Sequence, residues 1–176
     1  MISHLASKLF MKSILSFILF FVAIPFVSHA QKIVSIESNG KKYEVLDMTA
    51  KGKVKWGGYE KIAGDAANSE TNGSANTIAI VKAIGDNKNF DGKPYAARLC
   101  SDAKDGGKDD WYLPSKEEAD IIFTFKEKFN VEERATIWTS TEANGTQAVT
   151  KYWYTGAHYN NQKVDDYHFV CIRKVE

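Results

Sequence analysis

The chain has 176 residues, and 23 lysines and arginines against 22 aspartates and glutamates leave it close to neutral, at +1. A near-neutral chain offers no electrostatic argument for nucleic-acid binding, because that binding needs a basic surface. The length suffices for one domain with a real hydrophobic core.

Residues 1–30 have the pattern of a secretory signal peptide. Lys8 and Lys12 precede an apolar run over 14–27, and Ser28-His29-Ala30 supplies small residues at the cleavage site. The run is too short for a membrane span, although an uncleaved anchor helix is the alternative. Cleavage near Ala30 would remove two lysines, change the net charge from +1 to −1, and release a secreted or periplasmic protein without a membrane span.

The chain has two cysteines, Cys100 and Cys171. In an oxidising compartment they are expected to pair, closing a loop of roughly 70 residues. Two buried free thiols are the alternative. A catalytic cysteine is not expected, because His168 would lie on the opposite face of a strand from Cys171.

The first half of residues 31–176 begins with a predicted β-hairpin. Residues 33–36 and 43–46 flank Asn39-Gly40, a pair that favours a type I′ turn. Residues 49–74 are rich in small and polar side chains and indicate a long surface connection.

Two helices are expected next. Ser74 would cap a helix over 75–84, with Ile78 and Val81 on its buried face. A second, short helix is expected over 94–101.

A strand, a stop signal and a helix start follow in close succession. The strand 111–113 is ended by Pro114, which has no N–H to donate to a sheet. Ser115 and Glu118 have the spacing of a capping box, in which each side chain bonds the other's backbone N–H. A helix with one buried face is predicted over 116–129.

The C-terminal third has the alternation and spacing of short strands. These are predicted over 136–141, 148–154 and 167–174, with turns at Asn144-Gly145 and Asn160-Asn161. Helices followed by strands indicate an α+β domain with an antiparallel sheet. Five residues of these blocks are interpreted as scaffold and not as a site: Trp111, Pro114, Ser115, Glu118 and Trp138.

Together these blocks resemble the Lcl C-terminal domain family, the module that ends a bacterial collagen-like adhesin. The resemblance covers about residues 92–176. It departs from the family pattern where Tyr112 and Val170 stand in place of arginines and Thr139 in place of a serine. The matching residues are Gly106-Gly107, Asp110-Trp111, Leu113-Pro114-Ser115, Glu118, Trp138, Ser140-Thr141-Glu142, Cys171 and Arg173.

The resemblance implies a C-type-lectin-like fold over residues 31–176, with two main helices packed on a small twisted antiparallel sheet. It also implies a Cys100–Cys171 disulfide from the first-helix region to the last strand. The best-studied member of this family resembles an adhesin for sulfated polysaccharides. The resemblance therefore points to recognition of an extracellular glycan or surface polymer.

No cofactor or metal site is predicted. Asp102, Asp105, Asp109 and Asp110 could offer oxygen ligands to calcium, but their spacing is not that of an EF-hand loop. The triplets with which calcium-dependent lectins bind the ion are absent from the sequence. A solvated acidic loop is the simpler interpretation.

An enzyme is not expected either. Glu117, Glu118 and Asp120 lie at one helix start, where capping and the helix dipole account for them. Glycoside hydrolysis needs two carboxyl groups facing each other across the substrate. No phosphate-binding glycine loop or serine-nucleophile motif is present.

The candidate ligand-binding residues come from an aromatic segment near the C-terminus. On a strand, Tyr152 and Tyr154 would share one face, while Tyr159, Asn160 and Asn161 would lie on a loop. Aromatic rings stack on sugars, and asparagine amides bond hydroxyls. The leading hypothesis is a non-catalytic module that binds carbohydrate or a surface polymer. The alternative is a structural or protein-interaction module of the envelope.

Overall fold

The computed structural model describes residues 31–61, 63–85 and 91–175, so the predicted signal peptide lies outside the described residues. None of the helices in these ranges has the length and apolar character needed to cross a bilayer. The helices and strands are α1 (Gly73–Ile84), α2 (Ala96–Ser101), α3 (Lys116–Phe123), β1 (Ile33–Ser38), β2 (Lys41–Asp47), β3 (Thr136–Glu142), β4 (Gln147–Tyr152), β5 (His158–Gln162) and β6 (Val170–Val175).

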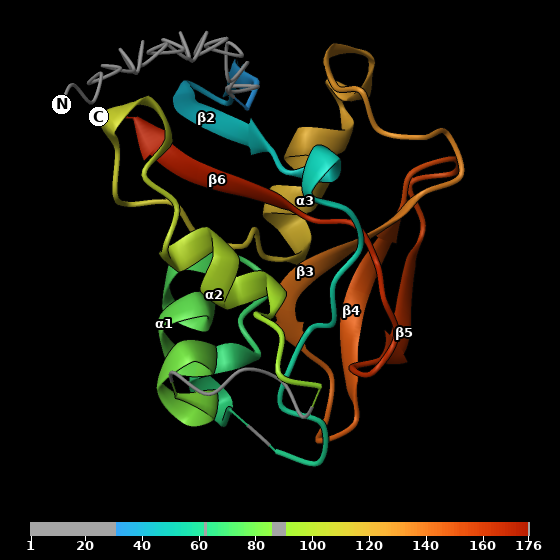
Figure 1. The fold of residues 1–176 in the computed structure, drawn as a ribbon. Coiled ribbons are helices and arrows are strands. Elements are labelled where there is room, and N and C mark those ends of the chain that lie inside the picture. Colours follow the sequence, from blue (N-terminus) through green and yellow to red (C-terminus); the bar gives the residue numbers. More distant parts are fainter. Residues whose placement is uncertain (1–30, 62, 86–90, 176) are drawn as a thin grey trace, which may run out of the picture.

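The strands form two antiparallel sheets, β1-β2-β6 and β3-β4-β5 (Figure 1). The α+β class is therefore confirmed, but the strands of these ranges form two small sheets where one was expected. The second edge of β6 pairs with a single residue, Tyr112, through two bonds to Ile172 of 2.9 and 2.8 Å. Pro114, two residues further on, cannot donate an N–H and so limits this pairing.

The predicted N-terminal hairpin is confirmed. Asn39 and Gly40 both have positive φ, 51° and 71°, as a type I′ turn requires. Ile36 then pairs with Tyr43. Because β2 pairs on its other edge with β6, the beginning and end of the described chain share one sheet.

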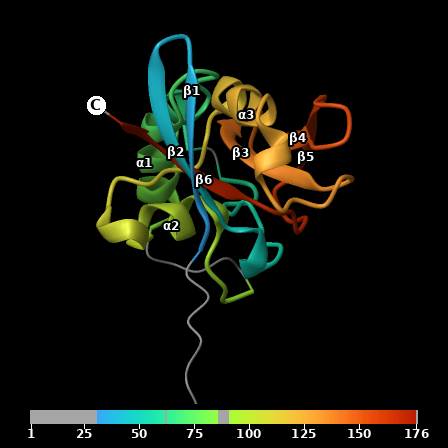
Figure 2. The same cartoon turned by 90° about the horizontal axis from the view of Figure 1, so that it is seen from above.

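Both faces of the β1-β2-β6 sheet are buried. Leu46 and Cys171 belong to a core with α1 and α2, while Val45 and Ile172 belong to a second core with α3. Figure 2 shows α1 and α2 on one side of this sheet and α3 with β3–β5 on the other. The two-sided burial follows from the strand alternation, since neighbouring residues point to opposite faces.

The face that α1 buries differs from the predicted one. Asn72, and not Ser74, caps the helix, its side chain accepting the N–H of Ala75. Ile78, expected in the core, is 67% exposed. Thr77 is buried in its place because its hydroxyl accepts the N–H of Leu113 at 3.0 Å. This long-range bond outweighs the apolar pattern.

The capping box before α3 is confirmed. Ser115 Oγ accepts the N–H of Glu118, and Glu118 Oε2 accepts the N–H of Ser115 at 3.0 Å. The helix ends at Phe123, shorter than the predicted 116–129. Thr124 Oγ1 donates to the carbonyl of Ile121 at 2.7 Å, which competes with continuation of the helix.

Cys100 and Cys171 form a disulfide with their Cα atoms 5.4 Å apart. The alternative of two free thiols is therefore wrong. The bond joins β6 to α2, the second helix, and not to the first-helix region. Trp111 and Trp138 lie in the same core, 3% and 0% exposed.

We predict that replacing both cysteines by serine lowers the free energy of unfolding by about 4 kcal/mol, because the bond closes a long loop in the unfolded chain. Urea unfolding of the oxidised protein and the double variant measures this. Wild-type protein under reducing conditions is the matched control. Equal midpoints for the oxidised protein and the double variant would contradict the prediction.

Candidate functional site

The aromatic segment singled out above forms the β4–β5 hairpin. The turn predicted at Asn160-Asn161 is wrong, because both residues lie within β5 and pair with Val149 and Ala148. The chain reverses earlier, at Gly156, whose N–H donates to the carbonyl of Tyr152 at 2.8 Å. This earlier reversal converts the expected loop into a strand.

Gly156 is required at this reversal. Its φ is +76°, in the left-handed region. A Cβ added there would lie 2.5 Å from the ring of Phe123 on α3. Backbone conformation and packing therefore both select glycine, and the hairpin is held close against α3.

The reversal gathers three of the predicted ligand residues. The ring of Tyr152 lies 6.3 Å from that of Tyr154 and 6.3 Å from that of Tyr159, edge to face in both cases. Tyr154 and Tyr159 are 49% and 52% exposed. The guanidinium carbon of Arg134 lies 5.8 Å from the centre of the Tyr154 ring. We call these four residues the tyrosine surface.

The two predicted asparagines contribute differently. Asn161 faces the same side of the sheet as Tyr159, and its amide donates to Thr150 Oγ1 at 2.9 Å. Asn160 is exposed, but strand alternation points it to the opposite face. The structure therefore brings together the tyrosines and not the asparagine pair. Sequence reasoning did not find Arg134, which precedes the three tyrosines by 18 or more residues.

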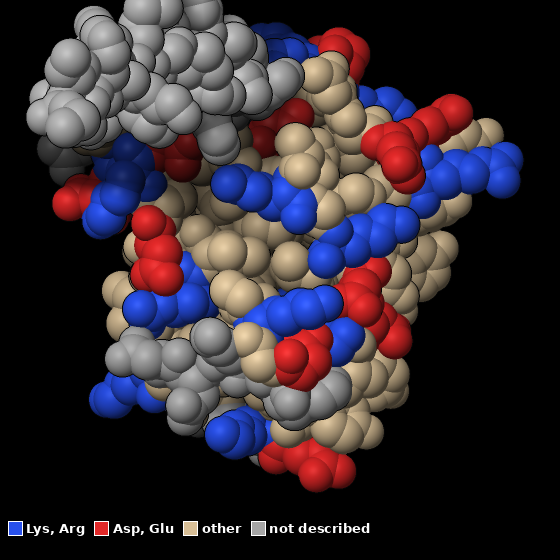
Figure 3. All heavy atoms as spheres, viewed as in Figure 1, with Lys and Arg blue, Asp and Glu red and all other residues tan. Residues whose placement is uncertain are grey.

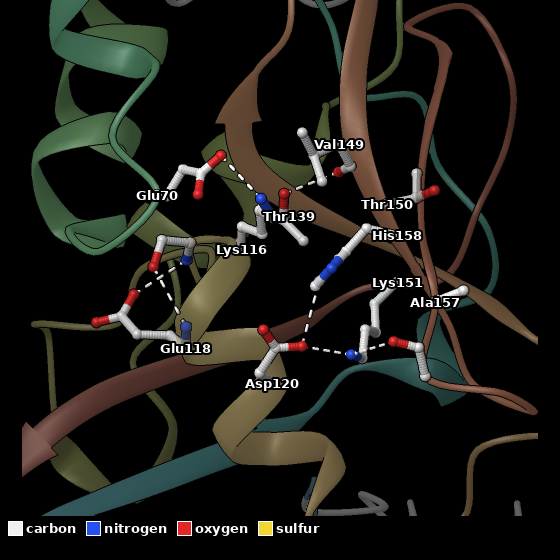
Figure 4. A network of polar contacts seen from close by, with 12 residues as sticks. Glu70, Lys116, Glu118, Asp120, Thr139, Val149, Thr150, Lys151, Ala157 and His158 are labelled. Atoms are coloured by element: carbon white, nitrogen blue, oxygen red, sulfur yellow. Dashed lines mark hydrogen bonds and ion pairs between the residues drawn. The ribbon is translucent and has the colours of Figure 1, made fainter.

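An ion cluster of Lys151, Asp120 and His158 lies next to the turn between β4 and β5 (Figure 4). Lys151, which is almost fully buried, donates to Asp120 Oδ1 and to the carbonyl of Gly156. His158 Nε2 lies 3.3 Å from the same carboxylate without forming a hydrogen bond. Burial lowers the pKa of His158, although Asp120 opposes this. The cluster thus ties α3 to the turn between β4 and β5.

A second buried lysine, Lys163, lies next to Trp56, which belongs to the core formed with α1 and α2. Lys163 is 0% exposed and donates to Glu142 Oε1 at 2.5 Å and to the carbonyl of Lys61 at 2.8 Å. Its ammonium also lies 4.5 Å from the ring centre of Trp56. Burial lowers the pKa of Lys163, and Glu142 partly offsets this. These three contacts offset the cost of burying the charge.

His168 is the least satisfied polar side chain in the described ranges. It is 8% exposed, and neither ring nitrogen has a hydrogen-bond partner there. Burial and the charge of Lys53 lower its pKa, against smaller opposing effects of Glu132 and Asp47. The ring lines an open hollow of about 600 Å³. No sequence pattern marked this residue.

Several of the acidic residues weighed as calcium or catalytic groups pair with other groups of the protein. Asp102 pairs with Arg98, and Asp110 with Arg173 at 2.6 Å. Glu118 accepts hydrogen bonds from Ser115, Gly73 and Tyr112. Across the parts of the chain that the structure describes, no three histidine, cysteine or acidic side chains are placed to hold a metal ion.

Comparison with known proteins does not name the site. No protein-family model matches this chain, and no curated protein matches it. The geometry of the tyrosine surface therefore carries the functional argument.

We predict that Lys163→Met lowers the free energy of unfolding by about 3–5 kcal/mol, because it leaves the Glu142 carboxylate buried and unpaired. The double variant Lys163→Met/Glu142→Gln should recover much of that loss, since no buried charge remains. Urea unfolding of both variants measures the difference. A single variant as stable as the wild type would refute the assigned ion pair.

We also predict that stability falls as the pH drops from about 7 to about 5. Burial holds the folded-state pKa of His168 below its ordinary value, so the unfolded chain binds the proton first and is favoured by acid. His168→Phe should flatten this dependence, and His158 accounts for part of what remains. Thermal unfolding across this pH range is the measurement. An unchanged slope in the variant would exclude His168 as its source.

Proposed function

We propose that this chain is an exported, non-catalytic recognition module that binds carbohydrate or a surface polymer through the tyrosine surface. The observation that carries the proposal is the convergence of Tyr152, Tyr154 and Tyr159, two of them half exposed. Phenol rings offer flat apolar faces to sugar rings and hydroxyls to sugar oxygens. Arg134 adds donors beside one ring.

Export is supported by the disulfide, since such bonds persist in oxidising compartments. A C-type-lectin-like fold and the family resemblance are supported by two features. The N-terminal hairpin shares a sheet with the last strand, and the Cys100–Cys171 bond links a helix to that strand. The lectin-like fold and the family remain part of the proposal, because the fold class alone does not identify a family.

The non-catalytic part of the proposal is supported by how the buried charges are used. Lys151, Lys163 and Glu118 each make several short-range contacts within the protein. A general acid or base needs a position from which it can reach a substrate proton. The face drawn in Figure 3 has basic and acidic side chains interspersed, which gives no support for nucleic-acid binding.

A protein partner is the second candidate, and one observation favours it. β5 forms an edge of the β3-β4-β5 sheet and carries Tyr159. An extended segment of another protein could add to such an edge. The two candidates differ in what the tyrosines contact, and glycan binding separates them.

We predict that Tyr154→Ala and Tyr159→Ala each weaken glycan binding by about 1–2 kcal/mol, roughly five- to thirtyfold, because each removes an exposed stacking face. A glycan array of the mature protein identifies the ligand, and titration of the variants gives the affinities. Ile78→Ala, which changes an exposed side chain of α1, is the matched control and should bind normally.

The array is run with and without calcium. Equal binding in both conditions is expected, because the acidic loop residues Asp102 and Asp110 are engaged by arginines. Binding to no glycan in either condition would overturn the carbohydrate proposal and favour the protein partner. Wild-type affinity in both tyrosine variants would move the site away from this surface.

A further inference from the structure

The hollow beside His168 lies where the exported chain would begin. Cleavage after Ala30 would make Gln31 the first residue, and Gln31 itself lines the hollow together with His168, Asp47 and Glu132. The side-chain oxygen of Gln31 is buried and has no hydrogen-bond partner among the described residues. Two unsatisfied polar side chains thus meet at one place, and one of them belongs to the predicted N-terminal residue.

The backbone immediately after Gln31 is fixed in position. The carbonyl of Lys32 accepts the N–H of Asp47 at 2.9 Å, and the ammonium of Lys32 donates to the carbonyl of Lys128 at 2.6 Å. A new N-terminus at Gln31 therefore cannot move far from the hollow.

A glutamine at a free N-terminus has an intrinsic reaction. The α-amino nitrogen attacks the side-chain Cδ, and a new C–N bond closes a lactam ring. The bond between Cδ and the amide nitrogen breaks, and that nitrogen leaves as ammonia with a proton from the amine. The reaction needs no further reactant and removes the positive charge of the terminus.

The charges around the hollow favour a neutral terminus. Lys32 and Lys51 line it, and Lys53 is close enough to affect His168. Of the two acids present, Asp47 already accepts hydrogen bonds from Thr49 and Asn130. An α-ammonium group would add a fourth cation, whereas a lactam adds none and supplies an N–H donor and a carbonyl acceptor.

We infer that Gln31 of the exported chain cyclises to a pyroglutamyl residue whose lactam is seated in the hollow beside His168. The inference rests on the export and cleavage that form part of the proposed function. It does not depend on the tyrosine surface.

The test uses the full precursor, expressed with its own leader in an exporting bacterium and purified from the exported fraction. Intact mass should equal that of residues 31–176 with one disulfide, less one ammonia. Gln31→Asn cannot close the lactam ring and should show no such loss. A mature chain with an uncyclised Gln31 would overturn the inference. A chain beginning at another residue would also overturn it, while leaving glycan binding by the tyrosine surface to be judged separately.

Seating is tested with pyroglutamyl aminopeptidase. The folded protein should release the N-terminal residue at least tenfold more slowly than a synthetic pyroglutamyl peptide of the same first residues. Ala50 is exposed and lines the hollow, so Ala50→Trp should fill it, restore release and leave the disulfide intact. Release from the folded wild type as fast as from the peptide would overturn the seating.

Discussion

The fold depends on the pairing of the last strand, β6, with elements far away in the sequence. β6 bonds β2 along one edge, meets Tyr112 on the other, and is joined to α2 through Cys171. Its alternate residues enter both cores, so α1 and α2 on one side and α3 on the other are positioned relative to the same strand. Because this strand ends the described chain, the cores are complete only when the C-terminus is in place. Such non-local pairing carries a large loop-closure cost, which the disulfide reduces by restricting the unfolded chain.

The features that could be predicted from the sequence are those decided by a few neighbouring residues. Asn39-Gly40 specifies its turn because both positions need positive φ, and Ser115 with Glu118 caps α3 because the two side chains reach each other's backbone. The disulfide could also be predicted, because two cysteines allow one pairing. Neighbouring residues thus decide the turn and the cap, and the number of cysteines decides the disulfide. The tyrosines of the candidate site belong only partly to this group: Tyr152 and Tyr154 do lie together, but β4 ends at Tyr152, so the turn and not strand alternation places Tyr154 there.

What could not be predicted depends on partners brought in by the fold. Ile78 has the spacing of a core residue, yet α1 is rotated so that Thr77 can bond Leu113. Asn160-Asn161 has turn chemistry, yet Gly156 reverses the chain first and β4 supplies the missing strand partner. Arg134 reaches Tyr154 only because strands β3 and β4 are paired. A buried lysine such as Lys163 has no sequence signature at all, because its burial requires Glu142, Lys61 and Trp56 to meet around it.

The buried charges and the exposed rings of the candidate site are treated differently by the fold. Buried charges are matched inside the protein: Lys151 by Asp120 and Lys163 by Glu142. Matching of this kind stabilises one arrangement of the hairpin and the loops. The rings of Tyr154 and Tyr159, in contrast, keep about half of their surface in water although the turn beneath them is rigidly held. A support of this kind reduces the conformational entropy that binding would otherwise cost, so the exposed rings on this hairpin are suited to the ligand contact that we propose.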